Sequence, residues 1–129
     1  VEQCKYYGVR AWGTGVVARC TNVEVRQCGY SGVKASDGAS ITLIGAKTTV
    51  HHNCTKGGSA HYGLAVSGSP SSTIQLVFPL TKEHVAIDNG EGGNCGAEHG
   101  GDINQIKTIG AHAISSLSSA QTGETKSIH

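Results

Sequence analysis

Apolar and polar residues alternate along the chain in short runs that fit strands better than helices. Three runs each follow a glycine and place apolar side chains two residues apart: Val9-Arg10-Ala11, Val33-Lys34-Ala35 and Leu64-Ala65-Val66. A two-residue period is typical of a strand with one covered face. Turn residues follow each run, and further strand-like runs come next, at 16–18, 40–44 and 73–77 and then at 23–25 and 50–52. The pattern predicts two or three strands per segment.

The segment itself recurs along the chain. Val1 to Gly13, Val23 to Gly38 and Val50 to Gly68 can be written over one another, each with a cysteine followed by a glycine and two apolar residues. A repeat in the twenties, built of short apolar runs and glycines, indicates a solenoid. The matching residues are Cys4, Gly8, Val9, Ala11 and Gly13; Cys28, Gly32, Val33, Ala35 and Gly38; and Cys54, Gly63, Leu64, Val66 and Gly68.

The repeat has the form Cys or Asn, then Gly-Val-x-Ala-x-x-Gly-Ala-x-Ile-x-Leu, over roughly residues 1 to 109. It resembles the right-handed parallel β-helix proteins of the pectate-lyase-like superfold. The stretches 71–76 and 102–106 are also similar to β-helix repeat proteins of algae and other protists, most of which have no assigned chemistry. The superfold includes lyases, hydrolases, epimerases, phage tailspikes and inert scaffolds, so the resemblance implies a fold and leaves the activity open.

We therefore expect an all-β chain, a single-stranded right-handed parallel β-helix of about four coils over residues 1–109. Residues 110–129 leave the repeat and are rich in Ser and Thr. We expect this C-terminal extension to cover the open end of the solenoid or to bind a partner, because the end of a solenoid exposes unpaired strand edges.

Composition narrows the possible partners. The 129 residues fit one domain, and a net charge of +1 gives no electrostatic reason to expect binding to nucleic acid. The longest apolar run, around Ile74 to Leu80, is interrupted by Gln75 and Pro79, so we expect no membrane span.

The five cysteines allow three interpretations. Cys4, Cys28 and Cys54 should stack as a column about 4.8 Å apart, which is wider than the Cβ separation near 3.8 Å that a disulfide prefers. Buried free thiols are therefore favoured. A disulfide that involves Cys20 or Cys95 is the second interpretation, and a metal site is the third. The odd number of cysteines favours a reducing intracellular or organellar compartment, and nothing else in the sequence indicates localisation.

The metal interpretation would use residues around His51-His52-Asn53-Cys54 and His61. Neighbouring residues in a strand point to opposite faces, so we expect the imidazoles of His51 and His52 to be separated. No Cys-x-x-Cys or His-x-x-x-His spacing is present, and we predict neither a metal nor a cofactor.

The last repeat is degenerate and rich in acid/base groups. It resembles the polygalacturonases at His99-Gly100-Gly101 and Ile106-Lys107, but the paired aspartates and the Asn-Thr-Asp element of that family are missing. The favoured interpretation is a glycine-rich turn without a catalytic residue. The alternative is a hydrolase or lyase site. Its candidate groups are Asp88, Glu91, Glu98, His99, Asp102 and Lys107.

Two other groups of residues are candidates for partner contacts. The insertion 78–84 breaks the repeat and is expected to form a loop with an apolar tip and a polar rim, although its apolar residues could instead fold back over the core. Its candidate residues are Phe78, Leu80, Lys82 and His84. An aromatic group precedes the Gly-Val runs and could stack on sugars or on a protein, although caps on the corners of the coils are favoured. This group comprises Tyr6, Tyr7, Trp12, Tyr30 and Tyr62.

The sequence thus favours a non-catalytic structural or adaptor subunit that docks on other protein subunits in a larger assembly. The alternative is a carbohydrate-binding or carbohydrate-active module of the polysaccharide lyase or hydrolase kind. Whether the chain is an enzyme is left open, and the negative answer is favoured.

Overall fold

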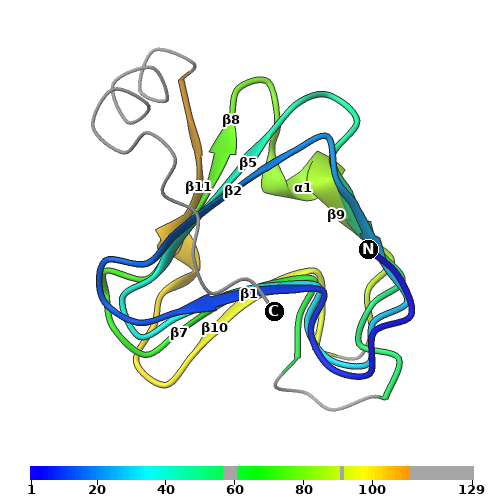
Figure 1. Ribbon diagram of the computed structural model, residues 1–129, viewed down its shortest axis with the longest axis horizontal. Coiled ribbons are helices and arrows are strands. Elements are labelled where there is room, and N and C mark those ends of the chain that lie inside the picture. Colours follow the sequence, from blue (N-terminus) through cyan, green and yellow to red (C-terminus); the bar gives the residue numbers. More distant parts are fainter. Residues whose placement is uncertain (57–60, 91, 111–129) are drawn as a thin grey trace.

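The computed structural model describes residues 1–56, 61–90 and 92–110, and these residues are mostly β. The strands form three sheets, ordered β1-β4-β7-β10, β11-β8-β5-β2 and β3-β6-β9. Every pairing between these strands is parallel, as expected of a parallel solenoid (Figure 1). The strands are β1 (Val9–Trp12), β2 (Val17–Thr21), β3 (Glu24–Arg26), β4 (Val33–Ser36), β5 (Ser40–Ile44), β6 (Thr49–His51), β7 (Leu64–Ser67), β8 (Thr73–Val77), β9 (Ala86–Ile87), β10 (Cys95–Glu98) and β11 (Ile106–Ile109).

The chain visits the three sheets in a fixed order, and we call one such passage a coil. The register confirms the repeat read from the sequence: Val9 lies beside Val33, Val33 beside Leu64, and Leu64 beside Cys95. The separation along the chain is 24 residues at the first step and 31 at each of the next two, because the connections between the strands differ in length. The strands stay in register because the backbone hydrogen bonds between parallel strands fix each coil upon the next.

Like residues stack inside the three-sided section visible in Figure 1. Ile41, Ile74 and Ile106 lie beside one another in adjacent strands and are at most 1% exposed. Leu43 and Leu76 form a second fully buried pair in the same sheet. Each large side chain therefore packs on its counterpart in the next coil, so the core depends on the register of the strands.

A left-handed residue turns the chain at one corner of every coil. Gln3, Gln27, His52 and Asp88 have φ values of 56°, 57°, 55° and 51°. Non-glycine residues rarely adopt this conformation, and its recurrence at matched places marks a repeated corner. The residues that come next are Cys4, Cys28, Asn53 and Asn89.

The predicted column of Cys4, Cys28 and Cys54 is therefore wrong at its third member. Arg26 pairs with His51, which places Asn53 in the column beside Cys28 and leaves Cys54 one residue further along. All five cysteines are free. Burial raises the pKa of the Cys28 thiol to about 11, and the neighbouring thiol of Cys4 adds to this effect.

The side chains of Asn53 and Asn89 each form hydrogen bonds with backbone groups of the preceding coil. The Asn53 side chain accepts a hydrogen bond from the Cys28 amide at 3.1 Å and donates one to the Val25 carbonyl at 3.0 Å. Asn89 repeats this arrangement one coil further, since it accepts from the Asn53 amide at 3.1 Å and donates to the Val50 carbonyl at 3.0 Å. Buried backbone groups need such partners, so this corner depends on Asn53 and Asn89.

Two short helical turns interrupt the strands. Helix α1 (Lys82–Val85) begins after Thr81, whose side chain accepts a hydrogen bond from the His84 amide. The 3-10 turn η1 (Ile103–Gln105) is capped by Asp102. No helix in the described ranges is long and apolar enough to cross a membrane. The predicted C-terminal extension lies outside the described residues from position 111 onward.

Replacing Asn53 by Ala should test this corner. We expect the free energy of unfolding to fall by about 3 kcal/mol, because two buried backbone groups lose their partner. Denaturant unfolding followed by circular dichroism measures the change. Asn104 is exposed, and the matched N104A variant should stay within about 0.5 kcal/mol of wild type. Equal stability of the two variants would contradict a structural role for the asparagine pair.

Candidate functional site: an aromatic and cationic face

The outer side of the sheet β1-β4-β7-β10 carries the most concentrated chemistry of the described residues. Ala11, Ala35 and Val66 point into the core, so the residues on either side of them point outward. The outward positions carry cations in the first two strands and an acid in the last, with small residues between. They are Arg10, Lys34, Ala65 and Gly96 in one row and Trp12, Ser36, Ser67 and Glu98 in the next.

An aromatic cluster lies next to these strands, supplied by the corner segments that lead into them. Tyr30 stacks on His61 with ring centroids 4.2 Å apart and an interplanar angle of 4°. Tyr6 and Tyr7 approach Tyr30 at 5.0 Å and 5.5 Å. The rings come from three different coils, and the register of the strands brings these corners together. Such ring pairs stabilise beyond the area that they bury.

Cationic side chains lie over these rings. The Arg10 guanidinium is 4.7 Å from the centroid of the Tyr7 ring and 5.0 Å from that of Trp12. The amines of Lys5 and Lys56 lie 5.3 Å and 5.1 Å from the Tyr6 centroid. These distances fit cation–π attraction, which stabilises a positive charge without a carboxylate beside it.

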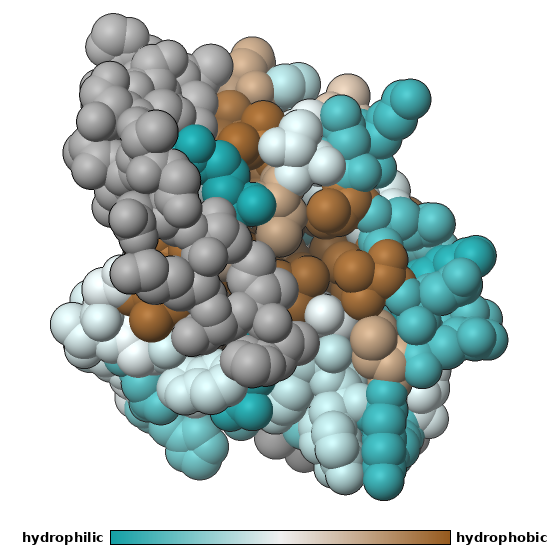
Figure 2. Space-filling model, viewed as in Figure 1, coloured by the Kyte–Doolittle hydropathy of each residue, from teal (hydrophilic) through white to brown (hydrophobic). Residues whose placement is uncertain are grey.

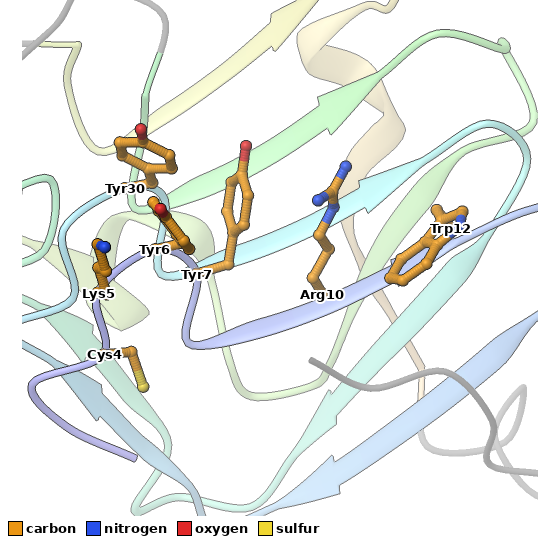
Figure 3. Close-up of a pocket in the computed structure, with 7 residues that line it drawn as sticks. All are labelled: Cys4, Lys5, Tyr6, Tyr7, Arg10, Trp12 and Tyr30. Atoms are coloured by element: carbon orange, nitrogen blue, oxygen red, sulfur yellow. The ribbon is translucent and has the colours of Figure 1, made fainter.

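A cavity of about 650 Å³ opens at this face (Figure 3). In Figure 3, the Arg10 side chain projects from β1 between the rings of Tyr7 and Trp12, on the same side of the strand. The cavity therefore combines apolar ring surface with positive charge. Its lining residues are Cys4, Lys5, Tyr6, Tyr7, Arg10, Trp12 and Tyr30. We call these seven residues and the space between them the aromatic–cationic pocket.

Beside the pocket, Lys34 and Glu98 form an ion pair across the outer face. The Lys34 amine is 2.9 Å from Glu98 Oε1, and the two side chains are 10% and 15% exposed. Lys34 lies on β4 and Glu98 on β10, with β7 between them. Ala65 is the outward residue of β7 next to Lys34, so the lysine side chain can extend across β7 without a large side chain in its way.

The charges of Lys34 and Glu98 also affect the pKa of His61. Burial lowers the pKa of its imidazole below the usual 6.5, the positive charge of Lys34 lowers it further, and the carboxylate of Glu98 opposes both effects. The ring is therefore held neutral over a wider pH range than a free histidine. A neutral ring stacks on Tyr30 without the desolvation cost of a buried charge.

Polar atoms without a protein partner gather on this face. Within the part of the chain that the structure describes, the buried side-chain atoms that lack a hydrogen bond are Arg10 Nε, Ser36 Oγ and His61 Nδ1. All three belong to residues of the outer face or of its aromatic cluster. Unpaired buried polar groups are rare in folded proteins and call for an explanation such as a ligand or an ordered water.

The acid/base residues predicted in the last repeat are only partly brought together: His99 Nε2 is 3.8 Å from Glu98 Oε2, and the others follow different elements. Asp88 sits at the corner after β9, Glu98 pairs with Lys34 at the end of β10, and Lys107 is exposed on β11, so these three follow different sheets. His99 is exposed next to Glu98, and the Asp102 side chain accepts a hydrogen bond from the Asn104 amide as the cap of η1. Glu91 lies outside the described residues.

The predicted contact loop divides into two parts. Phe78 is 69% exposed, whereas Leu80 is 7% exposed and belongs to the core cluster. Lys82 and His84 lie on α1, where His84 is exposed and its ring nitrogen Nδ1 is 3.0 Å from the Thr81 hydroxyl. The apolar tip is thus Phe78 alone, because Leu80 folds back over the core.

The expected separation of His51 and His52 is wrong. Their Nδ1 atoms are 2.6 Å apart, and His51 Nε2 is 2.8 Å from a Glu24 carboxylate oxygen. His52 follows the end of β6 in the left-handed conformation, so the alternation of a strand does not apply to it. Among the described residues, no group of three or more His, Cys, Asp or Glu side chains could hold a metal ion.

Sequence analysis identified the aromatic residues but missed the cations beside them. No functional role was assigned from the sequence to Lys5, Arg10, Lys34 or Lys56. The available signal was the register of the repeat: Arg10 and Lys34 occupy the same outward position in successive copies. Tyr62 lies over the last strand, since a Cβ atom on Gly96 would meet its ring.

We compared the chain with models of protein families, with curated proteins and with solved structures, and none of them matched.

Removing one member of the Lys34–Glu98 pair should be costly. We expect K34M to lower the free energy of unfolding by about 3 kcal/mol, because the Glu98 charge stays buried without its partner. The double variant K34M/E98L should recover to within about 1 kcal/mol of wild type. Urea unfolding of the single and double variants measures the coupling, and additive losses would show that the pair does not interact.

The titration of His61 tests the electrostatics of the face. We expect two-dimensional NMR to give a pKa below 6.5 for His61, and K34M to raise it, since the lysine charge is one cause of the depression. A histidine pKa lowered by folding stabilises the protein above pH 6.5, and this contribution is lost as the pH falls through the folded value. A His61 pKa unaffected by K34M would contradict the assigned cause.

Proposed function

We propose that the chain is a non-catalytic structural or adaptor unit that docks on other protein subunits through the end of its solenoid and the face beside it. The observation that carries this proposal is the aromatic–cationic pocket at the first strand of the sheet. Its residues offer contact surface and charge, and they include no pair of carboxylates of the kind that glycoside hydrolysis uses. The pocket lies at β1 and the corner before it, and its exposed rings leave it within reach of a partner.

As part of this proposal, the fold is a right-handed parallel β-helix of about four coils, similar to the pectate-lyase-like superfold. The stacked parallel sheets and the matched left-handed corners support it. In such a solenoid the two end coils differ from the inner ones, because each has a neighbour on one side only.

Partly buried apolar residues beside the core support docking. The apolar residues that contact the core but are only partly buried are Cys4, Val16, Cys20 and Val23 in the first coil, and Cys95 and Ala97 in the last. Figure 2 shows apolar atoms gathered in the middle of one face, with polar side chains to the right of them. An apolar patch with a polar rim is typical of a surface that contacts another protein.

Carbohydrate binding is the second candidate function. The specific observation that favours it is the exposed aromatic surface at the pocket, where Trp12 and Tyr6 are 40% and 48% exposed. Flat aromatic rings with polar atoms nearby can stack on a sugar ring. This alternative uses the same pocket and is also non-catalytic.

Chemical cross-linking in an extract of cells that make the protein tests the proposal. A lysine-reactive cross-linker followed by mass spectrometry should join Lys5 and Lys56, beside the pocket, to a partner protein at least about fivefold more often than Lys47, which is exposed on another corner. Loss of these cross-links in R10Q, with unchanged unfolding, would locate the docking surface.

Incubation with a panel of uronic-acid polymers is the companion experiment. We expect no release of shorter products by size-exclusion analysis. Product formation that is abolished in D102N would overturn the non-catalytic proposal. Retention of the intact polymer, without cleavage, would favour the carbohydrate-binding alternative.

A further inference from the structure

Asn89 and Gly90 form the single Asn-Gly pair of the sequence. An asparagine before a glycine is especially prone to spontaneous deamidation, because no Cβ atom hinders the approach of the glycine nitrogen to the asparagine side chain. In the structure this pair lies at a corner of the solenoid, directly after the left-handed residue Asp88. A chemically labile pair therefore occupies a position that the fold depends on.

The packing of the corner explains why a glycine follows this asparagine. A Cβ atom at position 90 would lie 2.6 Å from the Cys54 carbonyl oxygen and 2.9 Å from the Cys54 Cβ atom, which is closer than real Cβ atoms approach other atoms. The preceding coil thus leaves no room for a side chain at Gly90. The hydrogen bonds of the asparagine pair need the amide of Asn89, so packing and hydrogen bonding together impose the labile pair.

The groups that would react are all bonded in the folded corner. The Gly90 amide, which carries the attacking nitrogen, donates to the Asn53 carbonyl at 3.0 Å. The leaving group, Asn89 Nδ2, donates to the Val50 carbonyl at 3.0 Å and to Asn94 Oδ1 at 3.1 Å. Asn89 Oδ1 accepts from the amide and from the side chain of Asn53, both at 3.1 Å. Attack requires these bonds to break first, so the closed corner opposes the reaction.

We propose that Asn89 is a site of spontaneous deamidation that the folded corner suppresses and that reacts when the corner opens. The Gly90 nitrogen loses its proton and bonds to Asn89 Cγ, the bond from Cγ to Nδ2 breaks, and ammonia leaves with a proton. Water then opens the cyclic imide at either carbonyl, which leaves an aspartate or an isoaspartate at position 89. Water is the only co-reactant, and nothing is oxidised or reduced. This inference is independent of the proposed docking function.

The products do not fit the corner. A carboxylate at position 89 has no hydrogen to donate, so the carbonyl of the fully buried Val50 loses its partner and faces a negative charge. An isoaspartate also adds a carbon atom to the main chain ahead of β10, where Cys95 pairs with Leu64. A chain modified while this corner is open therefore cannot rebuild it, and the opening becomes irreversible.

The chain contains its own control in Asn53. It occupies the same place in the preceding coil, but it is followed by Cys54, whose side chain hinders the attack. The remaining asparagines also precede residues that carry a side chain. They are Asn22, Asn94 and Asn104.

Peptide mapping by mass spectrometry tests the inference on the full chain, incubated in one neutral buffer with and without guanidinium chloride. We expect the aspartate and isoaspartate forms of position 89 to accumulate at least about thirtyfold more slowly without denaturant, because the reaction waits for local opening. In denaturant, position 53 should react at least about tenfold more slowly than position 89. The rate at position 89 in denaturant should rise with pH, because the attacking nitrogen must lose its proton.

Matched variants test the protecting bonds. N94A removes the side-chain oxygen that accepts from the Asn89 amide and from Asn89 Nδ2, both at 3.1 Å. We expect it to speed the reaction at position 89 about tenfold without denaturant and to leave the rate in denaturant unchanged. N104A, which removes another exposed asparagine away from this corner, should leave both rates within about twofold of wild type. Thermal unfolding of both variants establishes that they fold.

Refolding tests the consequence of the reaction. Protein kept in denaturant until position 89 is modified should return to a less stable state than protein kept there only briefly, as measured by thermal unfolding after the denaturant is removed.

Several outcomes would overturn the inference. Equal rates at position 89 with and without denaturant would show that the corner gives no protection. An unmodified position 89 in denaturant, or faster reaction at position 53, would remove the site itself. Equal acceleration by N104A and N94A would show that the bonds to Asn94 do not protect the site. Full recovery of stability by the modified protein would show that the corner tolerates the products.

Discussion

The hydrogen bonding of parallel strands from coil to coil is the constraint on which the rest of the structure depends. Each described coil is too small to bury its own apolar side chains, and it does so only against the coils beside it. The columns of isoleucine and leucine in the core, the left-handed corner residues and the asparagine pair all follow from one register. A shift of one residue in any strand would turn its core residues outward.

The same register determines which side chains lie together on the outer surface. Side chains far apart in the sequence meet because the register brings neighbouring outward rows of the sheet together, as it does for Lys34 and Glu98 across β7. The rings of Tyr6, Tyr30 and His61 meet for the same reason at the neighbouring corner. The aromatic–cationic pocket is thus a product of stacking, because its residues come from strands and corners that the register brings together. The surface proposed for docking and the packing of the core therefore share this one cause.

The strands were predictable from the sequence because alternation and glycine spacing are local signals, and the structure places β1, β5 and β8 where the apolar runs predict them. The third member of the thiol column was predicted as Cys54, one residue after the true position. The column follows the residue after each left-handed corner, and in the third coil that residue is Asn53. The identity of a residue as cysteine was therefore a weaker guide than its place after the corner. The shared outward position of Arg10 and Lys34 could be predicted from the repeat, but the grouping of cations on aromatic rings could not, since it depends on the conformation of the corner connections. The contact between the rings of His51 and His52 was also not predicted, because β6 ends at His51 and the alternation of a strand does not continue to His52.

Variable corner connections have a consequence for how such a protein can change. The step from Val9 to Val33 is shorter than the step from Val33 to Leu64, yet both pairs lie side by side in one sheet. Residues can therefore be inserted or removed in the connections between strands while the paired strands keep their register. New binding preferences could arise there by simple changes in length, and duplication of one whole segment would lengthen the surface by a single rung. The architecture separates the part that must be conserved for folding from the part that is free to diverge.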